Sequence, residues 1–293
     1  MSEQDVQFIT AYDIAKYSDL LDFKEGIYIG AHLSLSNLFK EMRDLKAESA
    51  AFFTTTPQSW NVKIQSDKYQ LFYDQALQLK FYRNQFLPHG PYLLNLASEQ
   101  ERVREASFRR LVFEMFVVRS MGLDLLNIHP GTGSNIECVW DLINEAHKIV
   151  PDVIVVLETM AGNKVRSCVG SSFEQIKNII DHISDQNRIG VCIDTQHTFA
   201  GGYANKDNFS VELIQNFDRL IGRSYLKGFH INDSLTEYNS KVDRHAPLQQ
   251  GKHQKNEFKN LFSQRINSVY CLETTKPENW PQEIQLLKSY LTQ

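Results

Sequence analysis

VIVVLETMAG, residues 153–162, and RIGVCIDTQHT, residues 188–198, are short apolar runs rich in β-branched residues. Each run ends in polar residues, and a stretch with helical spacing lies between them. A strand that is apolar on both faces is typical of a parallel sheet, because helices cover both sides of such a sheet. The two runs therefore predict a strand–helix–strand unit with parallel strands.

The same pattern occurs eight times along the chain. The predicted strands lie within residues 27–34, 49–55, 85–90, 126–131, 153–162, 188–198, 225–234 and 268–277. A doubly wound open sheet usually has fewer strands and often a glycine-rich phosphate loop, and neither GxGxxG nor GxxxxGK[ST] occurs here. We therefore expect an α/β fold, a single (β/α)8 TIM barrel over residues 27–293. Residues 1–26 would form an N-terminal extension, with a helix around residues 12–23 lying on the barrel.

Apolar spacing and capping motifs support the helices between these strands. Residues 108, 111, 115 and 118 form one apolar stripe, and residues 173, 176, 180 and 183 form another. Ser98 with Glu101 and Ser171 with Glu174 match the capping box, in which side chains bond to the free backbone donors of a helix start. Each helix should bury one face against the sheet.

Composition and charge describe a chain of 293 residues that can bury a full core, with 42% hydrophobic residues. The formal net charge is −4, but residues 1–26 hold six acids and two bases, which leaves 29 acidic and 29 basic residues elsewhere. No apolar run reaches eighteen residues, the amino end is acidic, and the four cysteines lack CxxC spacing. We expect no membrane partner and no disulfides, in a cytoplasmic protein or, in a eukaryote, a nuclear one.

Imidazoles and carboxylates occur at the carboxyl ends of six predicted strands and in the loop after the seventh. In a (β/α)8 barrel these ends converge on one face. Because residues two apart share a face, Val156 precedes Glu158, and Cys192 precedes Asp194, on the barrel interior. The nine candidates are His89, His129, Glu158, Asp194, His197, His230, Asp243, His245 and Glu273.

Nine such groups are too many for one zinc ion, which takes three or four protein ligands. Any one of them alone can be an ordinary polar residue at a strand end, but clusters of His, Asp and Glu on one barrel face are the signature of metal ions. Three zinc ions would use all nine if one carboxylate bridges two ions. Asp194 and His197 can share an ion only if the chain turns just after Asp194, whereas Asp243 and His245 point the same way in an extended loop.

These residues resemble the motifs of endonuclease IV, a family of zinc-dependent apurinic/apyrimidinic (AP) endonucleases with a (β/α)8 fold. The most specific matches are VCIDTQHTFAGGY (191–203) and VDRH (242–245). The other matches are GAHLS (30–34), PHGPYLLNL (88–96), NIHPG (127–131), GFHINDS (228–234) and LET (272–274), of which GAHLS or a lone HPG would be weak evidence. The resemblance covers nearly all of residues 27–293.

By this resemblance the chain would bind three zinc ions. The ligand sets would be His89, His129 and Glu158 for the first ion, Glu158, Asp194, His230 and Glu273 for the second, and His197, Asp243 and His245 for the third. Glu158 and Glu273 are the candidate catalytic residues. Zinc lowers the pKa of a bound water from about 15.7 toward about 7, which makes a nucleophile available near neutral pH.

The resemblance also implies the substrate and its contacts. The enzyme would act as a monomer on double-stranded DNA, cleave the phosphodiester 5′ to an abasic site to leave a 3′-hydroxyl and a 5′-deoxyribose phosphate, and have a 3′-phosphodiesterase side activity. Tyr92 and Leu93 match residues that insert into the DNA stack, although both could instead pack within their loop. The other candidate contacts are Gln58, Arg244 and His32, and for phosphates Lys164, Arg166, Lys241 and Lys252.

His32 would lie near the site without binding metal, and the remaining histidines, His147, His182 and His253, would be surface residues in helical segments. Departures from the family affect the DNA-facing loops. In FTTTPQSW (53–60), Gln58 stands nearest to a family arginine that helps to wedge the DNA. SLSN (34–37), ETMAGN (158–163) and PLQQGK (247–252) also differ from the usual pattern. These changes leave the nine candidate ligands intact and put the damage preference in doubt.

Two other functions compete. A sugar isomerase or epimerase on a related barrel would cluster the same residue types around one or two metals, but a third metal held by Asp243 and His245 has no evident role in that chemistry. A non-catalytic binder of damaged DNA would be expected to lack one of the ligands, such as Glu158, and none is missing.

Overall fold

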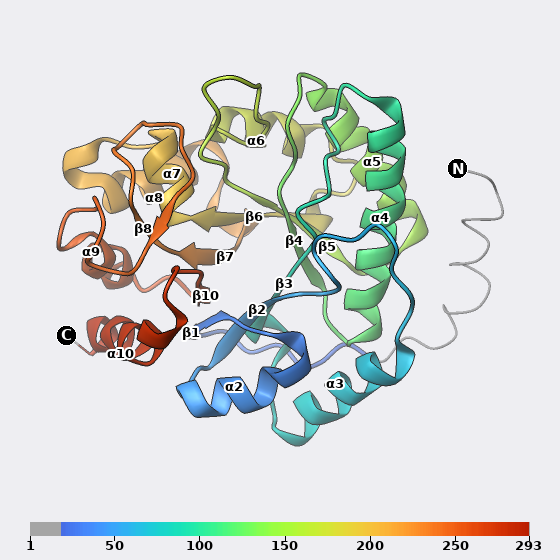
Figure 1. Ribbon diagram of the computed structural model, residues 1–293, viewed down its shortest axis with the longest axis horizontal. Coiled ribbons are helices and arrows are strands. Elements are labelled where there is room, and N and C mark those ends of the chain that lie inside the picture. Colours follow the sequence, from blue (N-terminus) through green and yellow to red (C-terminus); the bar gives the residue numbers. More distant parts are fainter. Residues whose placement is uncertain (1–18, 293) are drawn as a thin grey trace.

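The computed structural model describes residues 19–292, and their central feature is a closed barrel of eight parallel strands. Figure 1 shows the helices around the outside of this barrel. The strands are β1 (Ile27–His32), β2 (Ser49–Phe53), β3 (Phe86–His89), β4 (Leu125–Ile128), β5 (Ile154–Glu158), β6 (Ile189–Asp194), β7 (Leu226–Ile231) and β10 (Ser268–Leu272). Their order is β1-β10-β7-β6-β5-β4-β3-β2. All eight predicted strands and the TIM-barrel fold are confirmed.

The helices between the strands return the chain from the end of one strand to the start of the next. The helices are α2 (Leu38–Leu45), α3 (Ser66–Gln78), α4 (Glu101–Ser120), α5 (Ile136–Ile149), α6 (Phe173–Asp181), α7 (Thr195–Gly201), α8 (Phe209–Leu220), α9 (Glu257–Ser263) and α10 (Trp280–Leu291). A small antiparallel pair, β8 (Asp233–Ser234) and β9 (His245–Ala246), joins the two ends of the loop after β7. This pairing places the segment around His245 beside the end of β7.

Side chains alternate between two buried layers, as the strand phase predicts. The barrel interior holds a small cluster that includes Val156, Cys192 and Cys271. The larger cluster between strands and helices includes Leu157 and Phe229. The four cysteines are free. Polar candidates that share a face with Val156 or Cys192 therefore point into the barrel.

Several local predictions are wrong. Gln100, and not Ser98, is the N-cap of α4, and no side chain caps this helix. The cap of α6 is formed one residue later than predicted, because Ser172 accepts a hydrogen bond from the Gln175 backbone. Of the helix expected over residues 12–23, residues 12–18 lie outside the described residues, and residues 19–23 are not helical. In residues 19–292 no helix has the length and apolar character needed to cross a membrane.

The surface placement of the remaining histidines is correct only for His182, which is exposed. His147 is buried in α5. His253 lies outside the helices and packs its ring against Phe199, with ring centroids 4.3 Å apart. Phe199 is distant in sequence from His253, so the local pattern did not reveal this contact.

Candidate metal centre

The nine predicted ligands lie together at the carboxyl ends of the strands. His89, Glu158 and Asp194 are the last residues of their strands, and His230 is the last but one of β7. His129 and Glu273 come one residue after β4 and β10. The remaining three candidates are His197 in α7, Asp243 in the loop between β8 and β9, and His245 at the start of β9. Ion-pair contacts connect all nine into one cluster.

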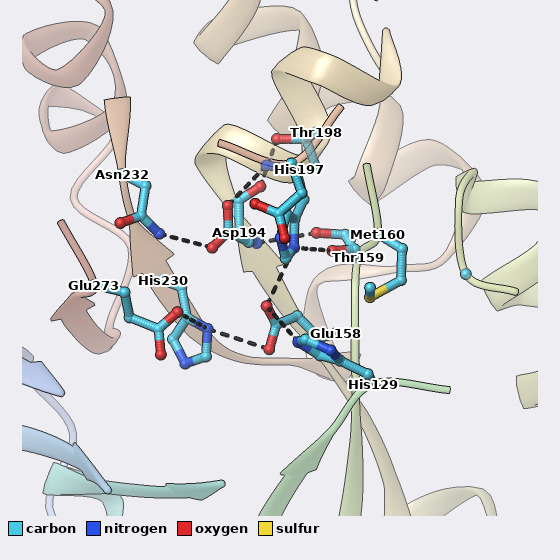
Figure 2. Close-up of polar contacts among 12 residues, drawn as sticks. His129, Glu158, Thr159, Met160, Asp194, His197, Thr198, His230, Asn232 and Glu273 are labelled. Carbon is cyan, nitrogen blue, oxygen red and sulfur yellow. Dashed lines mark hydrogen bonds and ion pairs between the residues drawn. The ribbon is translucent and has the colours of Figure 1, made fainter. Parts of the chain in front are cut away.

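Glu158 occupies the centre of this cluster, as Figure 2 shows for its contacts with three of the four histidines around it. Its Oε2 atom lies 3.2 Å from His89 Nε2 and 3.2 Å from His230 Nδ1. Its Oε1 atom lies 3.4 Å from His129 Nε2 and 3.3 Å from His197 Nδ1. The two oxygens therefore face different pairs of imidazoles, which suits a carboxylate that is shared between two cations.

Three groups of ligand atoms lie within 4.8 Å of one another. They are His89, Glu158 and His230; Glu158, Asp194, His230 and Glu273; and Asp194, His197 and His245. The second group is the full set expected for the second ion. The first group differs from the set expected for the first ion because it contains His230 instead of His129. The last group differs from the set expected for the third ion because it contains Asp194 instead of Asp243.

Asp243 nevertheless lies beside the third group. Its Oδ2 atom is 3.3 Å from His197 Nε2, and its Oδ1 atom is 3.3 Å from His245 Nε2. The loop that carries Asp243 and His245 is thus joined to α7 by one carboxylate that reaches both imidazoles.

A bound cation fits these residues because several of their ligand atoms are buried without a hydrogen-bond partner in the described part of the chain. They are Glu158 Oε1, His197 Nε2, His230 Nδ1, His230 Nε2 and His245 Nε2. Burying such a group unpaired costs about 1–3 kcal/mol each. The concentration of unpaired nitrogen and carboxylate oxygen atoms at one point is therefore best explained by metal coordination.

The start of α7 explains why Asp194 and His197 come together. Asp194 is the N-cap of this helix, and its Oδ1 atom accepts a hydrogen bond of 2.8 Å from the His197 backbone N–H. The chain therefore turns just after Asp194, as predicted. The ring atom Nδ1 of His197 lies 2.9 Å from the Thr159 carbonyl oxygen, which leaves Nε2 directed at Asp243.

Three polar residues beyond the nine orient the ligands. Asn127 Nδ2 donates to Glu158 Oε2 over 2.6 Å, and Asn232 Nδ2 donates to Asp194 Oδ2 over 2.8 Å. His32 Nδ1 lies 2.5 Å from Glu273 Oε1. The roles of the two asparagines were not predicted from the sequence, although strand alternation could have found them.

The charges of the cluster shift one another's pKa values. Burial lowers the pKa of His230, but Glu273 and Glu158 outweigh this and raise it to about 9. Burial likewise opposes protonation of His197, but Asp194 holds the His197 pKa well above its usual range. Burial raises the pKa of Glu158, yet His230 and His129 bring it well below normal. The raised pKa values of His230 and His197 show that the carboxylates favour positive charge at these positions, which a bound cation would supply.

Of the predicted DNA contacts, Tyr92 lies beside this cluster. Tyr92 is 56% exposed, and its ring centroid is 5.6 Å from that of His129. Leu93 is half-buried, whereas Gln58, Arg244, Lys164 and Arg166 are exposed. Lys241 Nζ donates to the Gly201 carbonyl, and Lys252 pairs with Glu237 over 2.7 Å. A role for any of these side chains in DNA binding stays a prediction.

A closed (β/α)8 barrel with imidazoles and carboxylates gathered at its carboxyl ends defines a TIM-barrel protein with a candidate metal centre. Residues 39–290 match the model of the xylose isomerase-like TIM barrel family, so the chain belongs to that family. The predicted relationship to endonuclease IV is also confirmed. The crystal structure of endonuclease IV from Thermus thermophilus has a TM-score of 0.80 and 25% identity, over 90% of this chain and 99% of that one.

Two curated relatives are named apurinic-apyrimidinic endonuclease 1. The protein of Plasmodium berghei (strain Anka) is 34% identical over 278 residues, which are 89% of this chain and 54% of the relative. That of Plasmodium falciparum (isolate 3D7) is 34% identical over 265 residues, which are 85% of this chain and 44% of the relative. The chain therefore spans about half the length of these two relatives.

Proposed function

We propose that this protein is a zinc-dependent AP endonuclease. It hydrolyses the phosphodiester 5′ to an abasic site in duplex DNA and leaves a 3′-hydroxyl and a 5′-deoxyribose phosphate, with a 3′-phosphodiesterase side activity. The observation that carries the proposal is the nine-residue cluster around Glu158, which includes Asp243 and His245. Similarity to endonuclease IV and to the two AP endonucleases supports the same chemistry.

We propose three zinc ions with the ligand sets expected from the sequence. Glu158 would be the shared ligand of the first two, which agrees with its contacts with His89 and His129 of the first set and with His230 of the second. Asp243, between His197 and His245, would complete the third set. When bound, zinc supplies a nucleophile from water near neutral pH and positive charge for the phosphoryl oxygens.

The chain's own residues orient these ligands. Asn127 and Asn232 each donate a hydrogen bond to one carboxylate oxygen, of Glu158 and of Asp194, and so fix the orientation of that carboxylate. His32 does the same for Glu273, with its Nδ1 atom 2.5 Å from Oε1. These contacts hold the carboxylates in place before substrate arrives, and so less free energy is lost when the phosphate is positioned.

Substrate recognition would depend on the loops above the centre. Tyr92 lies over His129 with its side chain more than half exposed, which suits a residue that enters the gap at an abasic site. Leu93, Gln58 and Arg244 would contact the same duplex. We further propose that the barrel of residues 27–293 acts as a monomer, with residues 1–26 as an extension, in the cytoplasm or in a eukaryotic nucleus.

The second candidate function is a metal-dependent sugar isomerase or epimerase. Such an enzyme needs one or two metal ions, so the third ligand set would have no catalytic role. The 3.3 Å approach of Asp243 to both His197 and His245 therefore favours the nuclease.

The test is incision of a duplex that carries one tetrahydrofuran abasic analogue. The proposal predicts a single cut 5′ to the analogue, which is lost after treatment with a strong chelator and restored by zinc. A chain that is loaded with zinc and leaves this duplex intact, or that cuts equally well with the chelator present, would contradict it.

A further inference from the structure

The loop after β2, residues 54–65, begins at the metal centre. Phe53, the last residue of β2, has its ring centroid 5.3 Å from that of His89 and 4.9 Å from that of Tyr92. The Thr54 backbone N–H donates to the His89 carbonyl oxygen over 3.2 Å. The loop therefore starts at the face where DNA would bind.

From there the loop follows α4 away from the barrel. Glu114 of α4 accepts hydrogen bonds from the hydroxyls of Thr54 and Thr55, the first two residues beyond β2. Arg110 lies one helical turn nearer to the start of α4, and its guanidinium donates to the carbonyl oxygens of Thr56 and Ser59. Later loop residues therefore contact positions nearer to the start of α4. Because α4 follows β3, its start lies at the carboxyl ends of the strands, and residues near 59 lie above these ends.

These contacts come from a fully buried ion pair. The side chains of Arg110 and Glu114 are 2% and 0% exposed, and Arg110 Nε lies 2.5 Å from Glu114 Oε1. Moving two charges out of water costs several kcal/mol per ion, and the hydrogen bonds to the loop offset this cost only when the loop is in place. The pair therefore holds the loop in one conformation.

Trp60 is the residue that this arrangement presents to solvent. On one side, Arg110 holds the Ser59 carbonyl. On the other, the Asn61 backbone N–H donates to Ser59 Oγ over 3.2 Å. The Trp60 side chain is 43% exposed, and it makes no ring contact or hydrogen bond with any residue in 19–292. The backbone is thus fixed, while the indole makes no ring contact or hydrogen bond in the described part of the chain.

We propose that Trp60 is a second aromatic DNA contact, which stacks on a base next to the abasic site. This proposal rests on the proposed function. An abasic site leaves the faces of neighbouring bases uncovered, and an indole can cover one at little entropic cost because its backbone is already held. The neighbours Gln58 and Asn61 are exposed and polar, so Trp60 does not belong to an apolar patch of the kind that binds another protein.

The first experiment measures incision kinetics of zinc-loaded Trp60→Ala on the tetrahydrofuran duplex. Stacking on one base contributes about 1–3 kcal/mol, which corresponds to about 5–150-fold. We expect KM to rise about 10-fold while kcat changes less than about 3-fold. Trp60→Phe should recover most of the loss, because a phenyl ring still stacks. Leu77→Ala is the matched control, since Leu77 is 50% exposed near the opposite end of α3.

The second experiment follows indole fluorescence on binding of the same duplex, in a Glu273→Gln background that we expect not to cleave. Trp140 and Trp280 are partly buried, so the difference between this protein and its Trp60→Phe variant reports on Trp60. Quenching confined to the protein with Trp60 supports the proposal, including the case in which Trp60→Ala fails to fold. Duplex binding with equal quenching in both proteins would overturn it, and so would an unchanged KM in a folded Trp60→Ala. If wild-type protein neither binds nor cuts the duplex, the proposed function fails as well.

Discussion

Glu158→Gln removes the central negative charge while it keeps the size of the side chain. In the structure the two carboxylate oxygens reach four imidazoles at 3.2–3.4 Å, and an amide can offer only one oxygen to a cation. The proposed first site then keeps His89 and His129, whereas protein zinc sites use three or four protein ligands. We therefore expect the zinc content of the variant to fall from three ions per chain to about two.

The loss in activity follows from the loss of that ion. A bound metal contributes several kcal/mol to the stabilisation of charge in the transition state, and each 1.36 kcal/mol corresponds to about tenfold in rate. We expect kcat/KM on the tetrahydrofuran duplex to fall by at least about 10³-fold. Glu145→Gln is the control, because Glu145 is exposed on α5 and pairs only with Lys148 among the described residues.

Elemental analysis after dialysis and incision kinetics are measured on the same preparations. Glu145→Gln should keep three zinc ions and wild-type kinetics. The reasoning would be refuted if Glu158→Gln kept its full zinc content with kcat/KM within about tenfold of wild type.

Three further predictions concern other parts of the molecule. Glu273→Gln should abolish incision and leave the melting temperature nearly unchanged; retained cleavage would disprove its assigned role. Asn232→Ala should weaken zinc affinity by about 10–100-fold in competition with a chromophoric chelator, because Asp194 loses its 2.8 Å donor, and an equal affinity would count against this role. Burial lowers the pKa of His147 to about 4, whereas its pKa in the unfolded state is about 6.5. Between pH 6.5 and pH 4 the unfolded state therefore binds more protons than the folded state, and the free energy of unfolding decreases as the pH falls. The free energy of unfolding is measured with urea, in the presence of a chelator, at pH 7.5 and at pH 4.5. Over this range His147→Leu should lose on the order of 2 kcal/mol less stability than wild type, whereas the control His182→Gln should lose as much as wild type. A loss in His147→Leu equal to that of wild type would contradict the prediction.

The barrel and the clustering of the candidate ligands at its strand ends were predictable because both depend on the period of a strand. Val156 before Glu158 and Cys192 before Asp194 place each carboxylate in the interior layer, and the structure has these residues there. The sequence indicated that Asp194 and His197, three residues apart, can share a site only if the chain turns just after Asp194, and in the structure this turn is the start of α7.

Other features depend on residues that meet only in the folded chain. Strand alternation places Asn127 on the face of His129 and Asn232 on the face of His230, but which carboxylate each of them contacts becomes visible only in three dimensions. The same holds for Arg110, which would be read as a surface residue of α4 without the loop that covers it. Which ligands group with which also depends on distances, since His230 lies close to two groups at once.

The central claim is that five imidazoles and four carboxylates form one trinuclear zinc centre. Anomalous diffraction from zinc-loaded crystals, recorded at the zinc absorption edge, tests it most directly. We predict three peaks at the carboxyl end of the barrel, one within each proposed ligand set, with Glu158 between the first two. A single peak, or zinc atoms away from these nine residues, would contradict the account.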